Sequence, residues 1–524
     1  MAWVCGRMSR REFLRRAGAV GVAAGVGTLA GRFASGQDRP AGRPNILFIV
    51  TDDQRAGTLG ALGGKVHTPH IDKLFTEGVR FDRAFASTTL CTPSRYVCLT
   101  GRYAGRCTHP EHLERYPPGE MNLAMNNTIA LEPDRPNVPR VLSEAGYTTG
   151  MVGKWHLGEW LSMKKGEGGF RKIPTDVPVD SPELQNVLKH NQNEMARRIT
   201  ACGFDYAANI CWANPANFGH KDIAVHNLEW FVKGAFDFID SVDEEPFFLW
   251  FATTHHHGPH PKRSMDLDPR ITYGGISDDH LDVMPSRQSA VERAVKAGAD
   301  KSNAFATWLD DGVGALLKKL EEAGKLDNTI VFYFVDHSMG SKSSLYDSGV
   351  RTPLAVWAKD LVKGGRVETR MVQNIDFAPT LFELAGARPP HGMPLDGRSL
   401  VPLLQNAKAD WPREDLYFEV GYERAVRTER WKYIAVRYPE DVTEKIASGE
   451  LERPPYHYFN PNLARKVAKR YPHYFDLDQL YDLENDPKEQ NNLAADPKYA
   501  EVLGQMKGRL REYLKSFAKR PFDV

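Results

Sequence analysis

A cysteine that precedes a proline and an arginine is the residue of this chain best suited to covalent chemistry. The segment reads Cys91-Thr92-Pro93-Ser94-Arg95, and an early proline is typical of the first turn of a helix. The N-terminus of a helix lowers the pKa of a thiol, so a catalytic thiol is one interpretation of Cys91. A buried thiol that acts as a small apolar side chain fits the same pattern, and this segment alone leaves both open.

Two acidic pairs directly follow strongly apolar stretches of the chain. Asp52-Asp53 comes after residues 45–50, and Asp336-His337 comes after residues 329–335. If both stretches are parallel strands, their carboxyl ends meet at one edge of a sheet. The three aspartates then offer hard oxygen ligands that repel one another without a cation, which favours calcium or magnesium. Carboxylates at strand ends also cap helices or begin turns, so each pair alone is weak evidence.

Apolar runs indicate which elements position these residues. Residues 45–50, 246–251 and 329–335 are continuous apolar runs, as expected for strands buried on both faces. Residues 304–323 carry apolar side chains at helical spacing. The predicted fold class is therefore α/β, with a mostly parallel central sheet flanked by helices.

The length of the chain and a change of pattern near residue 410 predict two structural units. A chain of 524 residues exceeds one ordinary core. Shorter, polar-flanked strands and a final helix follow residue 410, so we predict a main domain at 44–410 and a smaller C-terminal α+β subdomain at 411–524. Residues 161–193 show no periodicity, and we predict a surface insertion near the substrate there.

The charge and the cysteine content exclude several classes of function. The formal net charge of +1 gives no general attraction to nucleic acid or to anionic membranes. Six cysteines in so long a chain do not make a disulfide scaffold. Cys202 and Cys211 are close enough in sequence to form a disulfide in an exported protein, but spacing alone does not establish the required geometry.

The first 36 residues have the pattern of a targeting segment. Ser9-Arg10-Arg11-Glu12-Phe13-Leu14 precedes a mildly apolar run at 17–30, and small residues at 34–36 offer a cleavage site. This resembles a twin-arginine export signal, whereas a membrane anchor of about 14 weakly apolar residues would be too short to span a bilayer. We predict export to the periplasm or the extracellular space by the twin-arginine export machinery, with no stable membrane insertion.

The Cys-x-Pro-x-Arg pattern resembles the signature of type I sulfatases, a family with the alkaline-phosphatase-like fold. Further similarity runs from Pro44 to Leu493, so the main domain at 44–410 would be the sulfatase catalytic domain. The similar segments are Leu99-Thr100-Gly101-Arg102-Tyr103, the second signature at 146–158, His257-Gly258-Pro259, Asp336-His337, Lys342 with Tyr346-Asp347-Ser348-Gly349-Val350-Arg351-Thr352-Pro353, and the closing motif at 480–487.

This resemblance implies a modified cysteine and a metal site. A formylglycine-generating maturation enzyme would convert Cys91 to formylglycine. The metal would be Ca²⁺, with Mg²⁺ or Mn²⁺ as alternatives. Its implied ligands are Asp52, Asp53, Cys91, Asp336 and His337.

The resemblance also implies the role of each catalytic residue. Lys154 and Lys342 would stabilise the charge of the sulfate, and Arg95 would hold the hydrated aldehyde made from Cys91. His156 would hydrogen-bond that group and later take its proton, and His257 would protonate the leaving alcohol.

The chain departs from the family pattern at two places, and its match is ambiguous at a third. After Asp336 this chain has His337 and then Ser338-Met339-Gly340, where the family more often has Asn or His followed by Gly. An imidazole ligand at this position makes the choice of calcium over manganese less secure. Asp347-Ser348 replaces Glu-Gly, and we expect this to alter a turn. The run His255-His256-His257 leaves the register of His-x-Pro ambiguous, and with His260 it could instead be an adventitious metal patch.

The predicted function is an exported sulfatase that hydrolyses sulfate esters, with a sulfated glycan as the expected substrate and no nucleic-acid partner. One alternative is a phosphonate monoester or phosphodiester hydrolase of the same superfamily. The other is a non-catalytic sulfoglycan-binding relative, which an unmodified Cys91 would favour.

Overall fold

Eight strands form the main sheet of the computed structural model, which describes residues 42–121, 128–158, 160–278, 281–455, 460–517 and 522–524. The predicted export signal at residues 1–36 lies outside this range. In chain order the strands are β1 (Asn45–Thr51), β2 (Val79–Phe81), β4 (Thr148–Lys154), β5 (Tyr206–Cys211), β6 (Phe247–Ala252), β9 (Thr329–Val335), β10 (Leu354–Trp357) and β11 (Arg366–Glu368).

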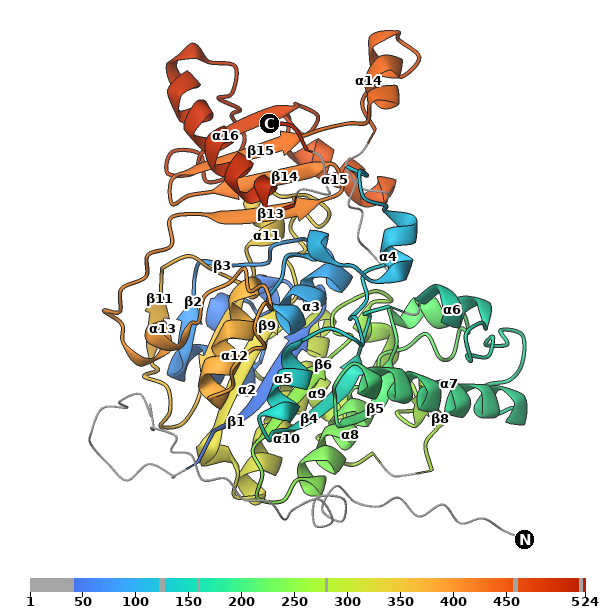
Figure 1. Cartoon of the computed structure of the whole chain (residues 1–524). Coiled ribbons are helices and arrows are strands. Elements are labelled where there is room, and N and C mark those ends of the chain that lie inside the picture. The colour runs from blue at the N-terminus through green and yellow to red at the C-terminus, as the bar shows by residue number, and fades with distance from the viewer. Residues whose placement is uncertain (1–41, 122–127, 159, 279–280, 456–459, 518–521) are drawn as a thin grey trace, which may run out of the picture. The chain divides into compact units, whose positions relative to one another are not determined.

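The order of the strands across the sheet is β11-β2-β10-β9-β1-β6-β4-β5. β10 is antiparallel to both of its neighbours, and the other pairings within this sheet are parallel. Figure 1 shows β1, β4, β6 and β9 running alongside one another in the middle of the sheet. The prediction of a mostly parallel central sheet is confirmed.

The central strands form because both of their faces are buried. Every residue of β1, β6 and β9 is buried, so these strands read as continuous apolar runs. Phe48 on β1 stacks on Trp250 of β6 and on Phe332 of β9, with ring centroids 5.0 and 5.1 Å apart. The three strands predicted from apolar runs are therefore present.

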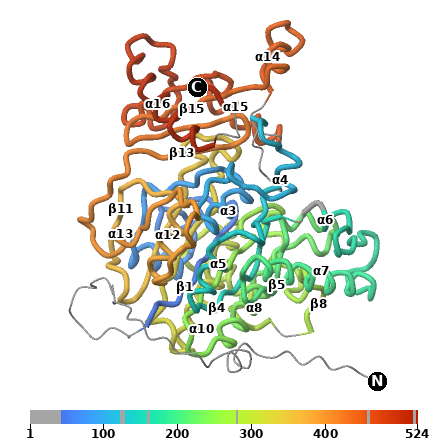
Figure 2. Tube along the Cα trace, viewed as in Figure 1, coloured from blue at the N-terminus to red at the C-terminus, as the bar shows by residue number. Residues whose placement is uncertain are grey.

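Helices flank the sheet in two groups. One group is α2 (Pro69–Glu77), α8 (Leu228–Ser241), α9 (Arg287–Lys296) and α10 (Ala304–Glu322), in which α10 contacts the other three. The other is α3 (Cys91–Thr100), α5 (Val138–Glu144) and α12 (Phe377–Ala385), which contact one another although they are far apart in sequence (Figure 2). The helix predicted at residues 304–323 is α10.

A second, antiparallel sheet follows the main one in the chain. Its strands are β13 (Leu416–Val420), β14 (Glu423–Arg427), β15 (Trp431–Val436) and β16 (Asp478–Asp482), paired in chain order. Helix α16 (Ala500–Lys515) packs against β14 and β15. A small C-terminal α+β unit is therefore present, and its boundary at residue 410 stays a prediction.

Further helices and two small sheets lie between these parts. The helices are α4 (Pro110–Arg115), α6 (Trp160–Lys165), α7 (Pro182–Ala201), α11 (Asp347–Val350), α13 (Val401–Gln405), α14 (Glu440–Ala447) and α15 (Pro461–Arg470). Two small two-stranded sheets pair β3 (Ala84–Phe85) with β12 (Val372–Gln373) and β7 (Ile271–Thr272) with β8 (Gly275–Ile276).

The irregular insertion predicted at 161–193 is partly helical. Helix α7 begins inside it, where the Ser181 side chain accepts a hydrogen bond from the Leu184 N–H and Pro182 occupies the first turn. Leu184, Leu188 and Met195 are buried on one face of this helix. The cap and the apolar spacing were readable in the sequence, but the polar residues around them obscured both.

Cys202 and Cys211 are buried, and neither of them is in a disulfide in the structure. The Cys202 Sγ donates to the Leu131 carbonyl at 3.4 Å, and the Cys211 Sγ donates to the Ala213 carbonyl at 3.1 Å. The disulfide left open by the sequence is therefore not formed.

A search of the described residues for membrane spans finds no helix with both the length and the apolar character needed to cross a bilayer.

A buried ion network joins the second sheet to the main domain. Lys432 on β15 lies 2.9 Å from Asp347, the first residue of α11, and 2.9 Å from Glu489. The Lys432 side chain is fully buried, and Arg427 also pairs with Asp347 at 3.3 Å. Asp347, which replaces the family's usual glutamate, is thus an attachment point between the two sheets.

Replacing Lys432 with methionine should strongly destabilise the protein, because two buried carboxylates would lose a cation that they share. Breaking such a buried pair costs about 3–5 kcal/mol. Urea unfolding followed by tryptophan fluorescence measures the loss. Arg430→Met is the control, because the Arg430 side chain is 49% exposed where it pairs with Asp482, and an exposed ion pair contributes little to stability. Equal losses for both variants would contradict the network's role.

Candidate active site

Four neighbouring strands bring the predicted site residues to one edge of the main sheet. β9, β1, β6 and β4 are adjacent and parallel, so their carboxyl ends lie side by side. Asp336-His337 follows β9, and Asp52-Asp53 follows β1. His257 lies shortly after β6, and Lys154 is the last residue of β4. This edge is where parallel sheets usually bind ligands.

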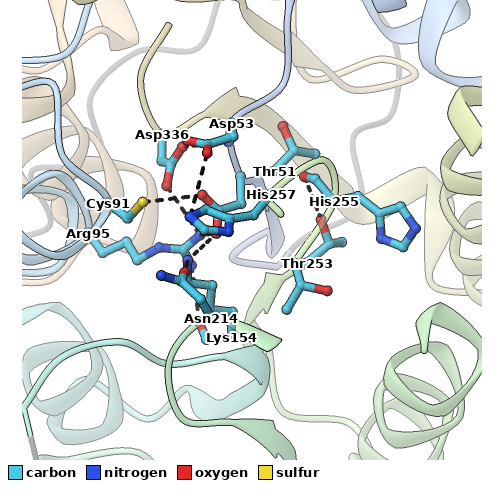
Figure 3. A network of polar contacts seen from close by, with 12 residues as sticks. Thr51, Asp53, Cys91, Arg95, Lys154, Asn214, Thr253, His255, His257 and Asp336 are labelled. Carbon is cyan, nitrogen blue, oxygen red and sulfur yellow. Dashed lines mark hydrogen bonds and ion pairs between the residues drawn. The ribbon is translucent and has the colours of Figure 1, made fainter. Parts of the chain in front are cut away.

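Helix α3 places Cys91 among these residues. Cys91 is the first residue of α3, and Arg95 lies one turn further along the same face. The Cys91 Sγ lies 3.3 Å from Oδ1 of Asp52 and 3.4 Å from Nε2 of His337. Figure 3 shows the side chains of Cys91, Arg95 and Asp336 pointing toward one another.

Arg95 is completely buried, and its side chain connects three of these segments by hydrogen bonds. Its Nη1 donates to the Lys154 carbonyl at 3.1 Å, and its Nη2 donates to Oδ2 of Asp336 at 3.3 Å. The guanidinium therefore connects α3, the end of β4 and the end of β9.

Two lysines bind the carboxylates that follow β1. The Lys154 Nζ donates to Asp52 and, at 2.5 Å, to Oδ1 of Asn214. The Lys342 Nζ donates to Oδ1 of Asp53 at 2.6 Å and lies 3.7 Å from the Cys91 Sγ. Both ammonium groups thus lie where they can meet an anion bound beside Cys91.

A backbone irregularity aims Lys154 into the site. The register between β4 and β5 shifts at Val152 and Gly153, as in a β-bulge. Gly153 has φ +99°, and a Cβ there would lie 1.9 Å from the Ala252 carbonyl oxygen. Only glycine fits this close approach.

Two of the predicted site residues have left-handed backbone angles. Asp53 and His156 both have φ 55°, which is uncommon for residues other than glycine. Such conformations are often found at functional sites, where the surrounding structure holds them. His156 is buried, and its backbone N–H donates to the Trp212 carbonyl at 3.0 Å.

The three carboxylates differ in their tendency to ionise. Burial acts against ionisation of Asp52, but the charges of Lys154 and His257 hold its pKa well below the usual range. Burial likewise opposes ionisation of Asp53, yet Lys342 and His257 lower its pKa to about 2. At Asp336, burial and the charge of Asp52 raise the pKa to about 8. A cation between the three would relieve this repulsion.

Burial also shifts the pKa values of the Cys91 thiol and of the imidazoles in the site. It raises the pKa of the Cys91 thiol well above the usual value, and the charge of Asp52 adds to the effect. This opposes a catalytic thiolate, despite the helix N-terminus. Burial lowers the pKa of His337 to about 3, and with the charge of Lys154 it lowers the pKa of His156 well below the usual value. Both imidazoles are therefore neutral, as a metal ligand or a proton acceptor must be.

The structure resolves the ambiguity of the histidine run. His257 Nε2 lies 3.5 Å from Oδ2 of Asp53, whereas the His255 ring points away and packs on Trp308 (Figure 3). His256 packs on Phe305. Among the residues that the structure describes, neither His255 nor His256 joins a group of metal-ligating side chains, and the same holds for His260.

The geometry fits a divalent cation. Ligand atoms of Asp52, Cys91, Asp336 and His337 lie within 4.8 Å of one another, and so do those of Asp52, Asp53, Cys91 and His257. Carboxylate oxygens suit a hard cation, and the Nε2 of His337 adds a nitrogen ligand. All ten predicted site residues lie in the segments that form this cluster of side chains at the edge of the main sheet.

One residue of the site was missed by the sequence analysis. Asn214 follows β5 and accepts a hydrogen bond from Lys154 at 2.5 Å. Its side chain also takes part in capping the short helix at 215–218. An asparagine before a proline is an ordinary turn signal, so nothing in the local sequence distinguished it.

The sheet order and this centre are those of the alkaline-phosphatase-like superfamily. The chain belongs to the sulfatase family, because the family model described as Sulfatase matches residues 44–387. A second model, described as N-sulphoglucosamine sulphohydrolase, C-terminal, matches residues 336–460. The protein is therefore a sulfuric ester hydrolase. Sulfatases in general use a metal ion and a formylglycine.

Curated relatives align along most of the chain. The N-acetylglucosamine-6-O-sulfatase of Bacteroides thetaiotaomicron is 25% identical over 92% of this chain and 88% of that protein. Arylsulfatase A of Bos taurus is 29% identical over 86% of this chain and 83% of that protein. A solved Bacteroides thetaiotaomicron structure, described with the metabolism of multiple glycosaminoglycans, has a TM-score of 0.61 at 22% identity and covers 90% of this chain and 99% of that one.

Adding a divalent cation should raise the thermal unfolding midpoint, because the cation binds the folded carboxylate cluster only. At 100 times the dissociation constant the gain is about 2.7 kcal/mol, or roughly several degrees for a chain of this size. Differential scanning fluorimetry with calcium, magnesium and manganese in turn measures the shift, and a chelator should reverse it.

Asp336→Asn should abolish this shift. Asp310→Asn is the matched control, because Asp310 is another buried aspartate whose carboxylate accepts backbone N–H groups of α2. An unchanged cation response in Asp336→Asn would contradict the proposed ligand set.

Proposed function

We propose that this protein is an exported sulfatase that removes sulfate from a sulfated carbohydrate, through a formylglycine made from Cys91 and a divalent metal ion. The observation that carries the proposal is the position of Cys91. Its Sγ lies 3.3 Å from Asp52, 3.4 Å from His337 and 3.7 Å from the Lys342 ammonium. A nucleophile built on this side chain would therefore stand between cation ligands and a fixed positive charge.

The proposed metal ion is calcium, with magnesium or manganese as alternatives. Asp52, Asp53, Asp336 and His337 would hold it, together with the residue made from Cys91. Three carboxylates favour calcium or magnesium, and the imidazole of His337 leaves room for manganese. When bound, the ion would polarise the sulfate and make the attacking hydroxyl more acidic.

The two lysines would stabilise the anionic sulfate. Asp52 holds Lys154 and Asp53 holds Lys342, so both ammonium groups are already oriented before the substrate arrives. Fixed charges of this kind stabilise a transition state without reorganisation. Arg95 would keep α3 and the end of β4 in register through its bond to the Lys154 carbonyl.

The two histidines would transfer protons in different steps of the reaction. His257 is 19% exposed, compared with 0% for Lys154, so it faces the side from which an alcohol can leave. It would donate a proton to the leaving oxygen. His156 is buried and neutral, and it would accept the proton when the formylglycine is regenerated.

A sulfated carbohydrate is the proposed substrate because relatives act on such molecules. One relative is an N-acetylglucosamine-6-O-sulfatase, and a structural neighbour is described with glycosaminoglycan metabolism. The twin-arginine-like N-terminus supports export to the periplasm or beyond, and the maturation enzyme would act on Cys91 before export. These two steps rest on the sequence.

A phosphodiester or phosphonate hydrolase is the second candidate. It is favoured by the Asp336-His337 pair, since members of the superfamily with that activity also carry an Asp-His metal pair. A non-catalytic sulfoglycan-binding protein is the third, and it requires Cys91 to stay a thiol.

Peptide mass spectrometry on residues 84–95 should reveal an aldehyde at position 91 when the protein is made with a formylglycine-generating enzyme. Cys98, which lies in the same helix and is also buried, should remain a thiol in the next tryptic peptide, residues 96–102, and serves as the internal control. Conversion should accompany faster turnover of nitrophenyl sulfate than of an aryl phosphodiester. A persistent thiol would favour the binding protein, and faster phosphodiester turnover would favour the second candidate.

A further inference from the structure

Helix α15 carries four exposed cations on its outward face. They are Arg465, Lys466, Lys469 and Arg470, whereas Ala464 and Val467 are buried on the other side of the helix. At about 100° per residue, these four positions span roughly 140° of the helix surface. We call this set the α15 cation face.

The α15 cation face differs from the charged surfaces of α8 and α10. Within the described residues, none of its four side chains forms an ion pair with a carboxylate. On α8 and α10, by contrast, Lys233 and Lys318 pair with carboxylates four residues further on. The α15 cation face instead places like charges four residues apart, which destabilises a helix. A partner of opposite charge would offset this cost.

The last turn of α15 is attached to the loop that carries the catalytic Lys342. Arg470 Nη1 donates to the Gly340 carbonyl at 3.0 Å. Gly340 is exposed and lies between His337 and Lys342 in the chain. The α15 cation face therefore begins at the rim of the active site.

A second contact fixes the same attachment. The Tyr471 hydroxyl lies 2.5 Å from the Ser348 Oγ, which donates to the Ser341 Oγ at 2.7 Å. Tyr471 also stacks on Tyr346, with ring centroids 3.6 Å apart. Lys466, one turn before Arg470, lies on the same side of the helix and extends the positive charge away from the rim.

We propose that the α15 cation face binds anionic groups on the sugars next to the one being desulfated. This rests on the proposed function and narrows its substrate class to a chain that carries several sulfates or carboxylates. The protein as a whole has a net charge of only +1, so the attraction is local to this face. A substrate with one isolated sulfate would gain nothing from it.

Binding of dextran sulfate to the full-length protein tests the proposal. The triple variant Arg465→Gln, Lys466→Gln, Lys469→Gln should bind it about ten-fold more weakly at physiological salt, with a smaller dependence on salt, because three charge contacts are lost. Arg470 is left in place because it holds Gly340. Isothermal titration calorimetry measures the affinity, and neutral dextran should not bind.

A matched variant controls for the change in net charge. Lys189, Lys296 and Lys408 are exposed lysines on other elements, and replacing all three with glutamine should leave dextran sulfate affinity within about two-fold of wild type. Equal losses in both triple variants, or no loss in the α15 variant, would overturn the proposal. Failure of the proposed function would appear separately, as absent turnover of nitrophenyl sulfate by the unmutated, converted protein.

A buried histidine outside the predicted set carries an independent inference. His226, immediately before the Asn227 cap of α8, is fully buried. Its Nε2 lies 3.0 Å from the His257 carbonyl and 2.7 Å from the Pro259 carbonyl, and its Nδ1 lies 2.8 Å from the Thr254 hydroxyl. Carbonyl oxygens only accept hydrogen bonds, so the proton is on Nε2 and Nδ1 accepts from Thr254.

We infer that His226 is a positioning residue for His257. The neutral ring binds the backbone carbonyls of the residues on both sides of Gly258. Burial lowers the pKa of His226 to about 4, so the ring stays neutral and keeps this tautomer at neutral pH. His257 can donate a proton to a leaving alcohol only from one position. The inference therefore rests on the leaving-group role of His257.

The dependence of rate on the leaving group tests this role. His226→Phe should lower kcat for an alkyl or sugar sulfate roughly 10- to 100-fold more than for nitrophenyl sulfate, because a good leaving group needs little protonation. His226→Gln, whose amide can donate to the same carbonyls, should restore part of the difference.

His255→Phe is the matched control, because His255 is a neighbouring buried ring with no hydrogen-bond partner among the described residues. It should affect both substrates equally. Equal losses on both substrates in His226→Phe would show a merely structural role and overturn the inference. Absence of any sulfate turnover in the wild-type protein would instead count against the proposed function.

Discussion

Three buried carboxylates at the ends of two adjacent strands impose the constraint that the rest of the active site satisfies. Asp52, Asp53 and Asp336 cannot all be charged in a buried position unless positive groups approach them closely. The lysines and the arginine that do so come from β4, from the loop after β9 and from α3. The charge balance therefore exists only when the whole sheet edge has assembled, and stability and chemistry depend on the same contacts.

The second sheet contributes to this balance indirectly. Lys342 lies in the loop between β9 and β10, and this loop ends at α11, whose first residue is bound by Lys432 of β15. Arg470 binds the Gly340 carbonyl of this loop, and the Tyr471 hydroxyl contacts Ser348 of α11. The C-terminal unit thus contacts the loop and α11 at three places, and the position of the Lys342 ammonium depends on both sheets.

The sequence predicted most of the fold and nominated ten site residues, which the structure brings to one edge of the sheet, and the two predictions had different sources. β1, β6 and β9 were evident because strands buried on both faces are apolar throughout. The site residues were found through their resemblance to a known family, since Lys154 or His156 taken singly looks like any lysine or histidine. The start of α7 was missed because its apolar stripe is thin and its neighbours are polar.

Residues that act through the backbone of others could not be predicted. His226 binds two carbonyl groups, and such contacts leave no pattern of residue types at fixed spacing. Asn214 is likewise recognisable only once β4 and β5 are adjacent. The Lys432 network depends on strand register in the second sheet, which follows from tertiary packing and not from local sequence.

The proposed function would separate recognition of the sulfate from recognition of the molecule that carries it. The groups facing Cys91 come from the main sheet and α3, where a shift of any strand would disturb several charges at once. The exposed groups near the rim come from the segment between β15 and β16, which contains α14 and α15 and joins neighbouring strands. A long insertion between paired strands can change without altering the sheet. In the proposed function the sulfate site would therefore be fixed by the fold, whereas substrate choice would vary through this insertion.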